Sequence, residues 1–296
     1  MTLAPPLADR RLTGIVLIVV AYCCFAVIDS SAKWLGLAGL PIMQVVFLRY
    51  AGSLFAVGAF YLPKQGIALI KTRSFRTELL RAGALLGSSV CNLTAVQYLP
   101  LTVTSSIAFT MPLILCALSI PMLSEHVGPR RWTAIAVGFV GVLVIAAPGS
   151  SAFHPAALLS LAGATFSALY FLWTRKLAGI DSTATQQFYG SLTATIVLAP
   201  PALLNWVWPT QSVDWYVCAV IGLAGFVGHQ LSTSAHRFAP ASSLAPFAYF
   251  QIVIMALSGW LVFQQQPDAN LYAGAPIVIA SGLYLWFRER ELSNPP

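Results

Sequence analysis

Two residues of opposite charge, Asp29 and Arg49, lie inside long apolar stretches of the sequence, at 13–35 and 41–62. A charge at the centre of a bilayer costs about 3 kcal/mol on insertion scales, so a charge there needs a partner. Only a short connection separates the two stretches, and both residues lie at a similar distance from it. We therefore predict a structural ion pair that joins two neighbouring helices. The alternative is that Arg49 meets a substrate carboxylate, or that Asp29 binds a substrate amine or a proton.

The apolar stretch 214–236 carries a polar stripe within the sequence GHQLSTSAHRF (228–238). Its members recur at helical spacing: His229, Ser232, Thr233 and His236. Facing lipid, these groups would lack hydrogen-bond partners, so the stripe should face protein or a water-filled cavity. We interpret His229, Ser232 and Thr233 as substrate-binding residues, and His229 can also carry a proton near neutral pH. The alternative is that they only join helices by hydrogen bonds.

Hydroxyl, amide and aromatic side chains recur at the depth where a central cavity would lie. Tyrosine combines a stacking face with a hydroxyl, which suits amphipathic solutes and cations. For the aromatic members, the alternative is packing between helices or anchoring at the membrane interface. Together with Asp29, the further candidate substrate-binding residues are Tyr22, Phe25, Ser88, Asn92, Ser106, Thr110, Phe166, Tyr170, Tyr249 and Gln251.

Two prolines, Pro112 and Pro246, lie inside apolar stretches. A proline frees a backbone carbonyl in the preceding turn and allows the helix to bend. We interpret both as hinges, and a static kink is the alternative. Beyond these residues, the sequence lacks a nucleophile–base order, a phosphate-binding glycine loop and metal-ligand spacing, so we expect no catalytic residue, no metal and no cofactor.

The composition indicates a protein that lies mostly in lipid. The chain of 296 residues is 58% hydrophobic and 8% charged, whereas soluble domains have about 25% charged residues. The net charge of +7 does not indicate nucleic-acid binding, because the basic residues lie in short connections between apolar runs. At roughly 20 residues per span, the sequence predicts ten membrane helices: 13–35, 41–62, 78–98, 101–123, 132–148, 154–174, 184–206, 214–236, 241–263 and 270–287.

The distribution of lysine and arginine predicts the orientation. With ten helices both termini lie on the same side, and all of the 16 basic residues except Lys33 and Arg49 then fall on that side. Cytoplasmic loops carry an excess of Lys and Arg. We therefore expect a multi-pass protein of the cell inner membrane with both termini in the cytoplasm. Arg81 is among the residues that this interpretation assigns to the cytoplasmic face.

The two halves of the chain resemble each other. The segment 98–118 aligns with 237–258, with Pro100 on Pro240, and the alignment continues without a gap into 130–143 and 270–283. An odd number of helices per repeat inverts the second copy, as in many secondary transporters. The predicted fold is an all-α integral membrane protein with ten transmembrane helices as two inverted five-helix repeats (5+5), at 1–150 and 151–296.

The layout, the sequence FLRYA (47–51) and the pattern at 111–145 resemble the drug/metabolite transporter (DMT) superfamily with paired EamA-type domains. The 111–145 pattern has a proline, a glutamate at the end of its first helix and a glycine-rich second helix. Within the superfamily, the chain is most similar to amino-acid exporters of the YddG type. The resemblance implies a cavity lined by helices 1, 3, 4, 6, 8 and 9, with helix 2 outside it and helices 5 and 10 peripheral.

The predicted function is a secondary transporter that exports small amphipathic metabolites by alternating access through a central cavity. The favoured cargo is an amino acid, and aromatic amino acids are included. The alternatives are transport of a drug-like cation or a nucleotide-sugar and, from a different class, an intramembrane enzyme or receptor. The expected partners are a small-molecule substrate and the lipid bilayer, without nucleic acid. Proton coupling and facilitated diffusion both fit the sequence, and it leaves the oligomeric state open.

Overall fold

The computed structural model describes residues 7–123, 129–147, 153–177, 180–238, 247, 250–266 and 269–293. These residues form helices and connections without a strand, as the all-α prediction requires. Five helical segments are long and apolar enough to cross a membrane, and three shorter apolar helices accompany them in the described ranges.

The helices follow the predicted segments closely, with ends that differ by a few residues. The first half contains α1 (Leu7–Leu37), α2 (Ile42–Gln65), the short 3-10 helix η1 (Gly66–Ile70), α3 (Phe75–Tyr98), α4 (Leu101–Ala108), α5 (Met111–Leu123) and α6 (Pro129–Ala146). The second half contains α7 (Ala156–Leu177), α8 (Thr183–Leu204), α9 (Ser212–Phe238), α11 (Phe250–Phe263) and α12 (Ala269–Ser293). Since α4 and α5 together fill the fourth predicted span and α11 belongs to the ninth, the described elements account for ten spans.

The fourth span is broken where the sequence analysis expected only a bend. Helix α4 ends at Ala108, and α5 begins at Met111, so that Pro112 is the second residue of the new helix. A proline is tolerated in the first turn of a helix because its missing N–H would have no partner there. The Thr110 hydroxyl donates to the Ile107 carbonyl at 2.7 Å and satisfies a backbone group at the break.

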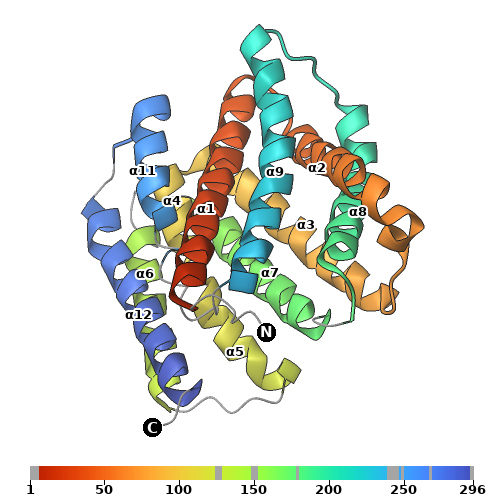
Figure 1. The fold of residues 1–296 in the computed structure, drawn as a ribbon. Helices are drawn as coiled ribbons and strands as arrows, with labels where there is room; N and C mark the ends of the chain where they lie inside the picture. The colour runs from red at the N-terminus through yellow and green to blue at the C-terminus, as the bar shows by residue number, and fades with distance from the viewer. Residues whose placement is uncertain are drawn as a thin grey trace, which may run out of the picture.

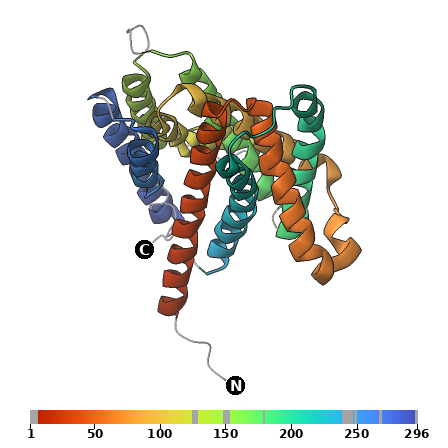
Figure 2. The ribbon, with the colours of Figure 1, turned by 90° about the horizontal axis from the view of Figure 1, so that it is seen from above.

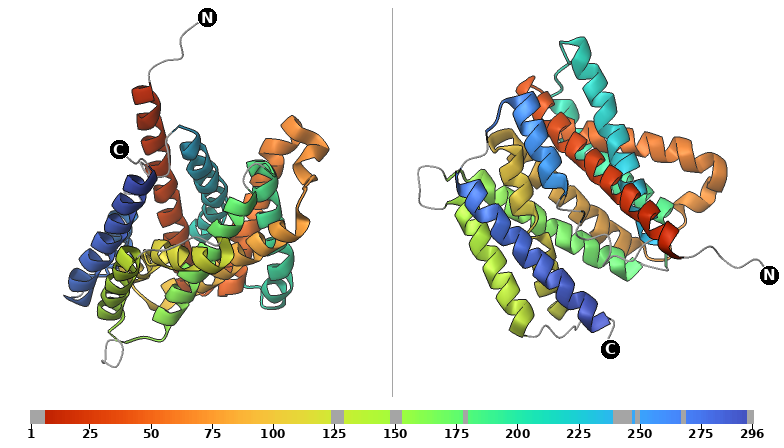
Figure 3. Two further views of the ribbon diagram at one scale, coloured as in Figure 1. Left: turned by 90° about the horizontal axis from the view of Figure 1, so that it is seen from below. Right: turned by 60° about the vertical axis from the view of Figure 1, so that its left-hand side comes forward.

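The spans are arranged as a layered bundle (Figure 1). Helices α6 and α12 pack together at one edge, α2 and α8 pack together at the opposite edge, and α1, α3, α7 and α9 lie between them. The view from above shows the same order, with α1 running through the middle of the bundle (Figure 2). The two further views show α6 and α12 side by side, away from α2 (Figure 3).

Contacts between the two halves occur in matching pairs. Helix α1 packs on α9 as α7 packs on α3, and α2 packs on α9 as α8 packs on α3. The counterparts α2 and α8, α4 and α11, and α6 and α12 also contact each other directly. This exchange symmetry is expected of two five-helix repeats that are inverted relative to each other.

Single residues repeat the same symmetry. A Cβ placed on Gly87 of α3 would lie 3.0 Å from the Phe166 ring of α7, and one placed on Gly228 of α9 would lie 2.9 Å from the Phe25 ring of α1. Gly228 and Phe166 follow Gly87 and Phe25 by the same number of residues. In both halves, therefore, a glycine allows a phenylalanine of the other half to approach the helix backbone.

Candidate functional site

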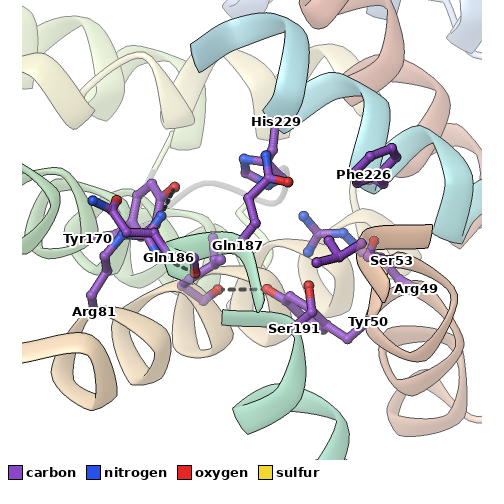
Figure 4. A pocket seen from close by; sticks show the side chains of 13 residues that line it. Arg49, Tyr50, Ser53, Arg81, Tyr170, Gln186, Gln187, Ser191, Phe226 and His229 are labelled. Carbon is purple, nitrogen blue, oxygen red and sulfur yellow. Dashed lines mark hydrogen bonds between the residues drawn. The ribbon is translucent and has the colours of Figure 1, made fainter. Parts of the chain in front are cut away.

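A small cavity lies between α2, α3, α7, α8 and α9 (Figure 4). The side chains come from both halves of the chain, so this cavity lies at the interface between the repeats. Its lining residues are Arg49, Tyr50, Ser53, Val57, Arg81, Leu85, Tyr170, Gln186, Gln187, Ser191, Gly225, Phe226 and His229.

Arg81 of α3 is the most extensively bound cation of the cavity. The residue is 4% exposed. Its Nε donates to the Thr174 hydroxyl at 2.8 Å, one terminal nitrogen donates to the Gln186 carbonyl at 2.9 Å, and the other donates to the Tyr170 hydroxyl at 2.8 Å. Its guanidinium also lies 4.6 Å from the centre of the Tyr170 ring. The planar fork of arginine is thus held by α7 and α8 of the second repeat.

Arg49 of α2 is the second cation of the cavity and is 7% exposed. Its guanidinium donates to the Ser89 hydroxyl and lies 4.7 Å from the centre of the Tyr50 ring. The Tyr50 and Ser89 hydroxyls are hydrogen-bonded to each other at 2.6 Å. These contacts leave part of the guanidinium facing the cavity, where a substrate can accept its remaining hydrogen bonds.

The predicted ion pair between Asp29 and Arg49 is wrong, because the described residues include no salt bridge between them. The Ser89 hydroxyl and the Tyr50 ring satisfy Arg49 instead. Asp29 accepts a hydrogen bond from the Asn92 amide at 3.0 Å, which joins α1 to α3. The two charges interact only through space, and helix α2 lines the cavity that the resemblance assigned to other helices.

Two polar side chains of the cavity lack a hydrogen bond to any described residue. They are Gln187 of α8, at both its amide nitrogen and oxygen, and His229 of α9, at Nε2. Both side chains enter the cavity in Figure 4. Because a buried polar group without a partner costs roughly 1–3 kcal/mol, these atoms are groups that a bound molecule could satisfy.

The arginines make the cavity asymmetric despite the symmetric fold. In the register that relates Phe25 to Phe166, Arg49 corresponds to Gly190 and Arg81 corresponds to Gly222. The first repeat therefore supplies both positive charges, and the second repeat has glycine at the equivalent positions. Gly190 lies against Arg81, where a Cβ would be 3.8 Å from a terminal nitrogen of the guanidinium.

Of the predicted substrate-binding residues, Tyr170 and His229 line the cavity. The His229 ring lies between two aromatic rings, with its centre 5.2 Å from that of Phe25 and 6.5 Å from that of Tyr170. The centre of the Tyr22 ring lies 6.0 Å from that of Phe25. The Thr233 hydroxyl donates a hydrogen bond to the His229 carbonyl at 2.9 Å. These residues form a continuous aromatic and polar seam between α1, α7 and α9.

The other predicted residues lie outside the lining of this cavity. Ser88 is hydrogen-bonded to Ser167 at 2.6 Å, and Asn92 to Asp29 at 3.0 Å, while Ser106 is buried in α4. Phe166 packs on Gly87, and the Thr110 hydroxyl donates to the Ile107 carbonyl at the break between α4 and α5. Ser232 lies on α9 with an interaction of its own, and Gln251 is half-buried at the start of α11. Tyr249 and Pro246 lie outside the described residues, as does the side chain of His236.

Several lining residues were not predicted from the sequence: Tyr50, Ser53, Arg81, Gln186, Gln187 and Ser191. Arg81 was assigned to the cytoplasmic face because the charge bias counts every arginine near a helix end. Its burial and its hydrogen bonds place it inside the helix bundle, which the charge bias did not indicate. A signal was available in the adjacent pair Gln186 and Gln187, two amides at the beginning of an apolar span.

Lys33, near the end of the predicted span 13–35, is also a buried cation. It is 4% exposed, and its ammonium donates to the carbonyls of Val96 and Leu99 at 2.6 Å each. These carbonyls lie at the end of α3, where the helix leaves acceptors without donors. Lys33 of α1 therefore caps α3, and a cation there also complements the negative end of the helix dipole.

Comparisons with known proteins agree with the bundle and its repeats. The sequence model described as the EamA-like transporter family matches residues 12–147 and 154–287. The chain is 30% identical to a riboflavin transporter of Vibrio cholerae, with 96% of each chain covered. It is 26% identical to an S-adenosylmethionine uptake transporter of Rickettsia prowazekii, with 95% of this chain and 94% of the relative covered.

A third relative is the pseudopaline exporter CntI of Pseudomonas aeruginosa, at 28% identity over 94% of this chain and 97% of that protein. A chain of a solved crystal structure shares the fold, with a TM-score of 0.64 and 17% identity over 97% of this chain and 99% of its own. None of these names supports the amino-acid cargo that the sequence analysis expected.

Proposed function

Because the chain belongs to the EamA-like transporter family and is a transporter of small metabolites, we propose that its cargo is a neutral or anionic molecule with a planar heterocycle. Riboflavin is the first candidate. The observation that carries the proposal is that Arg49 and Arg81 line one cavity. Two guanidiniums favour hydrogen-bond acceptors and negative charge and oppose a cation.

The remaining lining supports a flat, polar ring. Tyr50, Tyr170 and Phe226 offer aromatic faces, and Gln187 offers both a donor and an acceptor without a described protein partner. An amide of this kind can pair with the alternating donors and acceptors at the edge of a heterocycle such as riboflavin. S-adenosylmethionine carries a sulfonium cation and fits this charge poorly, although a relative is named for it.

We extend the proposal to the transport cycle. The cargo would cross by alternating access, with the two repeats, 1–150 and 151–296, moving against each other around the cavity. Pro112, at the start of α5, and Pro246 would serve as hinges. The lysine- and arginine-rich ends and both termini would face the cytoplasm, in the inner membrane of the cell.

A carboxylate-rich cargo is the second candidate, because the same two arginines bind carboxylates in a bidentate manner. A competition experiment tests whether one cavity binds both, since a neutral heterocycle and a polycarboxylate would displace each other only if they share it.

The test is counterflow in proteoliposomes that contain the purified protein and an excess of unlabelled riboflavin. We expect entry of labelled riboflavin, inhibition by unlabelled riboflavin and little inhibition by S-adenosylmethionine. Arg49→Gln should abolish entry, whereas Arg76→Gln, a change of an exposed arginine on α3, should not. Equal competition by riboflavin and S-adenosylmethionine, or full activity of Arg49→Gln, would overturn the proposal.

A further inference from the structure

Glu78, in the first turn of α3, is a buried carboxylate that the proposed transport site does not use. It is 0% exposed, and neither of its oxygens has a hydrogen bond to a described residue. Its nearest cation is Arg81 on the next turn, with 3.8 Å between Oε2 and a terminal guanidinium nitrogen. A buried charge with so little compensation is costly, which is unusual unless the group changes its charge during function.

A second carboxylate lies beside Glu78. Asp181, in the connection between α7 and α8, interacts with Glu78 electrostatically. Asp181 is held in place by the Thr72 hydroxyl, which donates at 2.5 Å, and by the backbone N–H of Arg73, which donates at 3.0 Å. Through these two hydrogen bonds, Asp181 joins the α7–α8 connection of the second repeat to the connection after η1 in the first repeat.

Glu78 lies between two cavities. Arg81, its ion-pair partner, lines the central cavity. Asp181, its other neighbour, lines a larger and more open cavity at the basic end of the molecule, together with Lys64, Lys71 and Arg73. Glu78 thus has one charged neighbour that lines each cavity, Asp181 for the open cavity and Arg81 for the central cavity.

The charged and polar groups around Glu78 come from six segments of the chain. Helix α3 itself supplies Arg81, and the α7–α8 connection supplies Asp181. Helices α7 and α8 face this region with the hydroxyls of Thr174 and Tyr170 and the carbonyl of Gln186, all of which bind Arg81. The basic residues of the open cavity lie on α2 and the η1–α3 connection.

We propose that Glu78 is a proton-binding site that couples transport to a proton gradient, an inference that rests on the proposed substrate cavity. When Glu78 is ionised, its carboxylate competes with the substrate for Arg81. When a proton from water in the open cavity forms an O–H bond on Glu78, the repulsion from Asp181 ends, and Arg81 is released to the substrate. Proton and substrate thus bind together, and the O–H bond breaks when the proton leaves on the opposite side with the substrate.

Coupled binding of this kind predicts symport. With one proton per substrate, a gradient of one pH unit would concentrate the substrate about tenfold, because one unit corresponds to about 1.4 kcal/mol. Glutamine resembles protonated glutamate in shape and charge. Glu78→Gln should therefore keep Arg81 available and retain riboflavin exchange between equal pH values, but lose accumulation driven by the gradient.

The experiment measures counterflow without a gradient and accumulation with one, in the same proteoliposomes, for the wild type, Glu78→Gln, Glu78→Asp and Glu291→Gln. We expect Glu78→Asp to recover part of the accumulation, because it restores a carboxylate, and Glu291→Gln, a change near the end of α12, to behave as the wild type. A wild type that exchanges riboflavin but ignores the gradient would overturn the proton site alone. Accumulation retained by Glu78→Gln would do the same.

Absence of counterflow in the wild type would instead contradict the proposed cargo, so the two failures are distinguishable. If Glu78→Gln does not fold, the wild type still decides the question through riboflavin affinity measured against pH. Affinity that rises about tenfold per unit as the pH falls, over part of the range, supports a proton taken up with the substrate. Affinity that does not change with pH contradicts it.

Discussion

At the scale of single residues, Arg81 holds three hydrogen bonds to two helices of the other repeat while its guanidinium lines the cavity. A lysine there would keep the charge but could not reproduce the fork. We predict that Arg81→Lys raises the KM for riboflavin about tenfold, equivalent to roughly 1.4 kcal/mol of binding. Initial rates of counterflow over a range of substrate concentrations measure this.

Arg76→Lys is the matched control, because Arg76 lies on the same helix and is exposed. Its KM should equal that of the wild type. If Arg81→Lys also leaves the KM unchanged, charge alone is enough, and the fork geometry of Arg81 has no part in recognition.

Lys33 shows that a buried cation can be structural. Lys33→Met would leave the Val96 and Leu99 carbonyls without their donor. The expected loss of stability is about 1–3 kcal/mol, the cost of leaving buried acceptors unpaired. Thermal unfolding of the purified protein in detergent measures it, with the exposed residue Lys71 changed to Met as the control. Equal melting temperatures for both variants would show that Lys33 does not cap α3.

At the scale of the elements, glycines set how closely the helices approach each other. Gly52 of α2 and Gly222 of α9 meet at the backbone, and a Cβ on Gly222 would lie 2.7 Å from the Cα of Gly52. Gly222→Leu should therefore push α2 and α9 apart at the wall of the cavity, with a loss of about 1–3 kcal/mol of stability. A lower melting temperature together with weaker riboflavin binding is the expected result.

Gly83 provides the control for this prediction. It lies on α3, and a Cβ there would meet no described atom within 4 Å. Gly83→Ala should be neutral or should stabilise the helix by up to about 1 kcal/mol, because alanine has the higher helix propensity. If both glycine variants melt alike, close backbone approach does not limit the packing of α2 on α9.

Much of the fold could be predicted at this scale, because the membrane requires apolar spans of a set length, separated by polar connections. The predicted segment 41–62 corresponds to α2, and 78–98 corresponds to α3. The break at Thr110 was less accessible, since Pro112 indicates a disturbance but not whether the helix bends or restarts. The partners of individual side chains were the hardest feature to predict from the sequence. Asp29 and Arg49 share a depth, but which way each points around its helix depends on packing that one sequence does not reveal.

At the scale of the whole molecule, two inverted repeats create one asymmetric site. The register that relates the Gly87–Phe166 contact to the Gly228–Phe25 contact also relates both arginines to glycines. The repeat could be predicted because it persists in prolines and apolar spans. The cavity was missed because the charge bias assigned Arg81 to the cytoplasmic face. His229 was identified because a polar stripe stands out on an apolar helix.

Inverted five-helix repeats require both termini to lie on the same side of the membrane. We predict that a green fluorescent protein fused to either terminus fluoresces in cells, and that alkaline phosphatase fused to either terminus is inactive, since both ends should be cytoplasmic. Active phosphatase at one end only would mean an odd number of spans. Such a result would remove the symmetry between the repeats.

The central claim is that the cavity containing Arg49 and Arg81 holds the transported molecule, and substrate protection of a cysteine tests it most directly. Ser191 lines this cavity, so Ser191→Cys, in a variant whose five cysteines are replaced by serine, places a thiol at the site. We predict that a small thiol reagent labels Cys at this position and that riboflavin slows the labelling in a concentration-dependent manner. A transport-competent variant whose labelling rate does not respond to saturating riboflavin would contradict the claim.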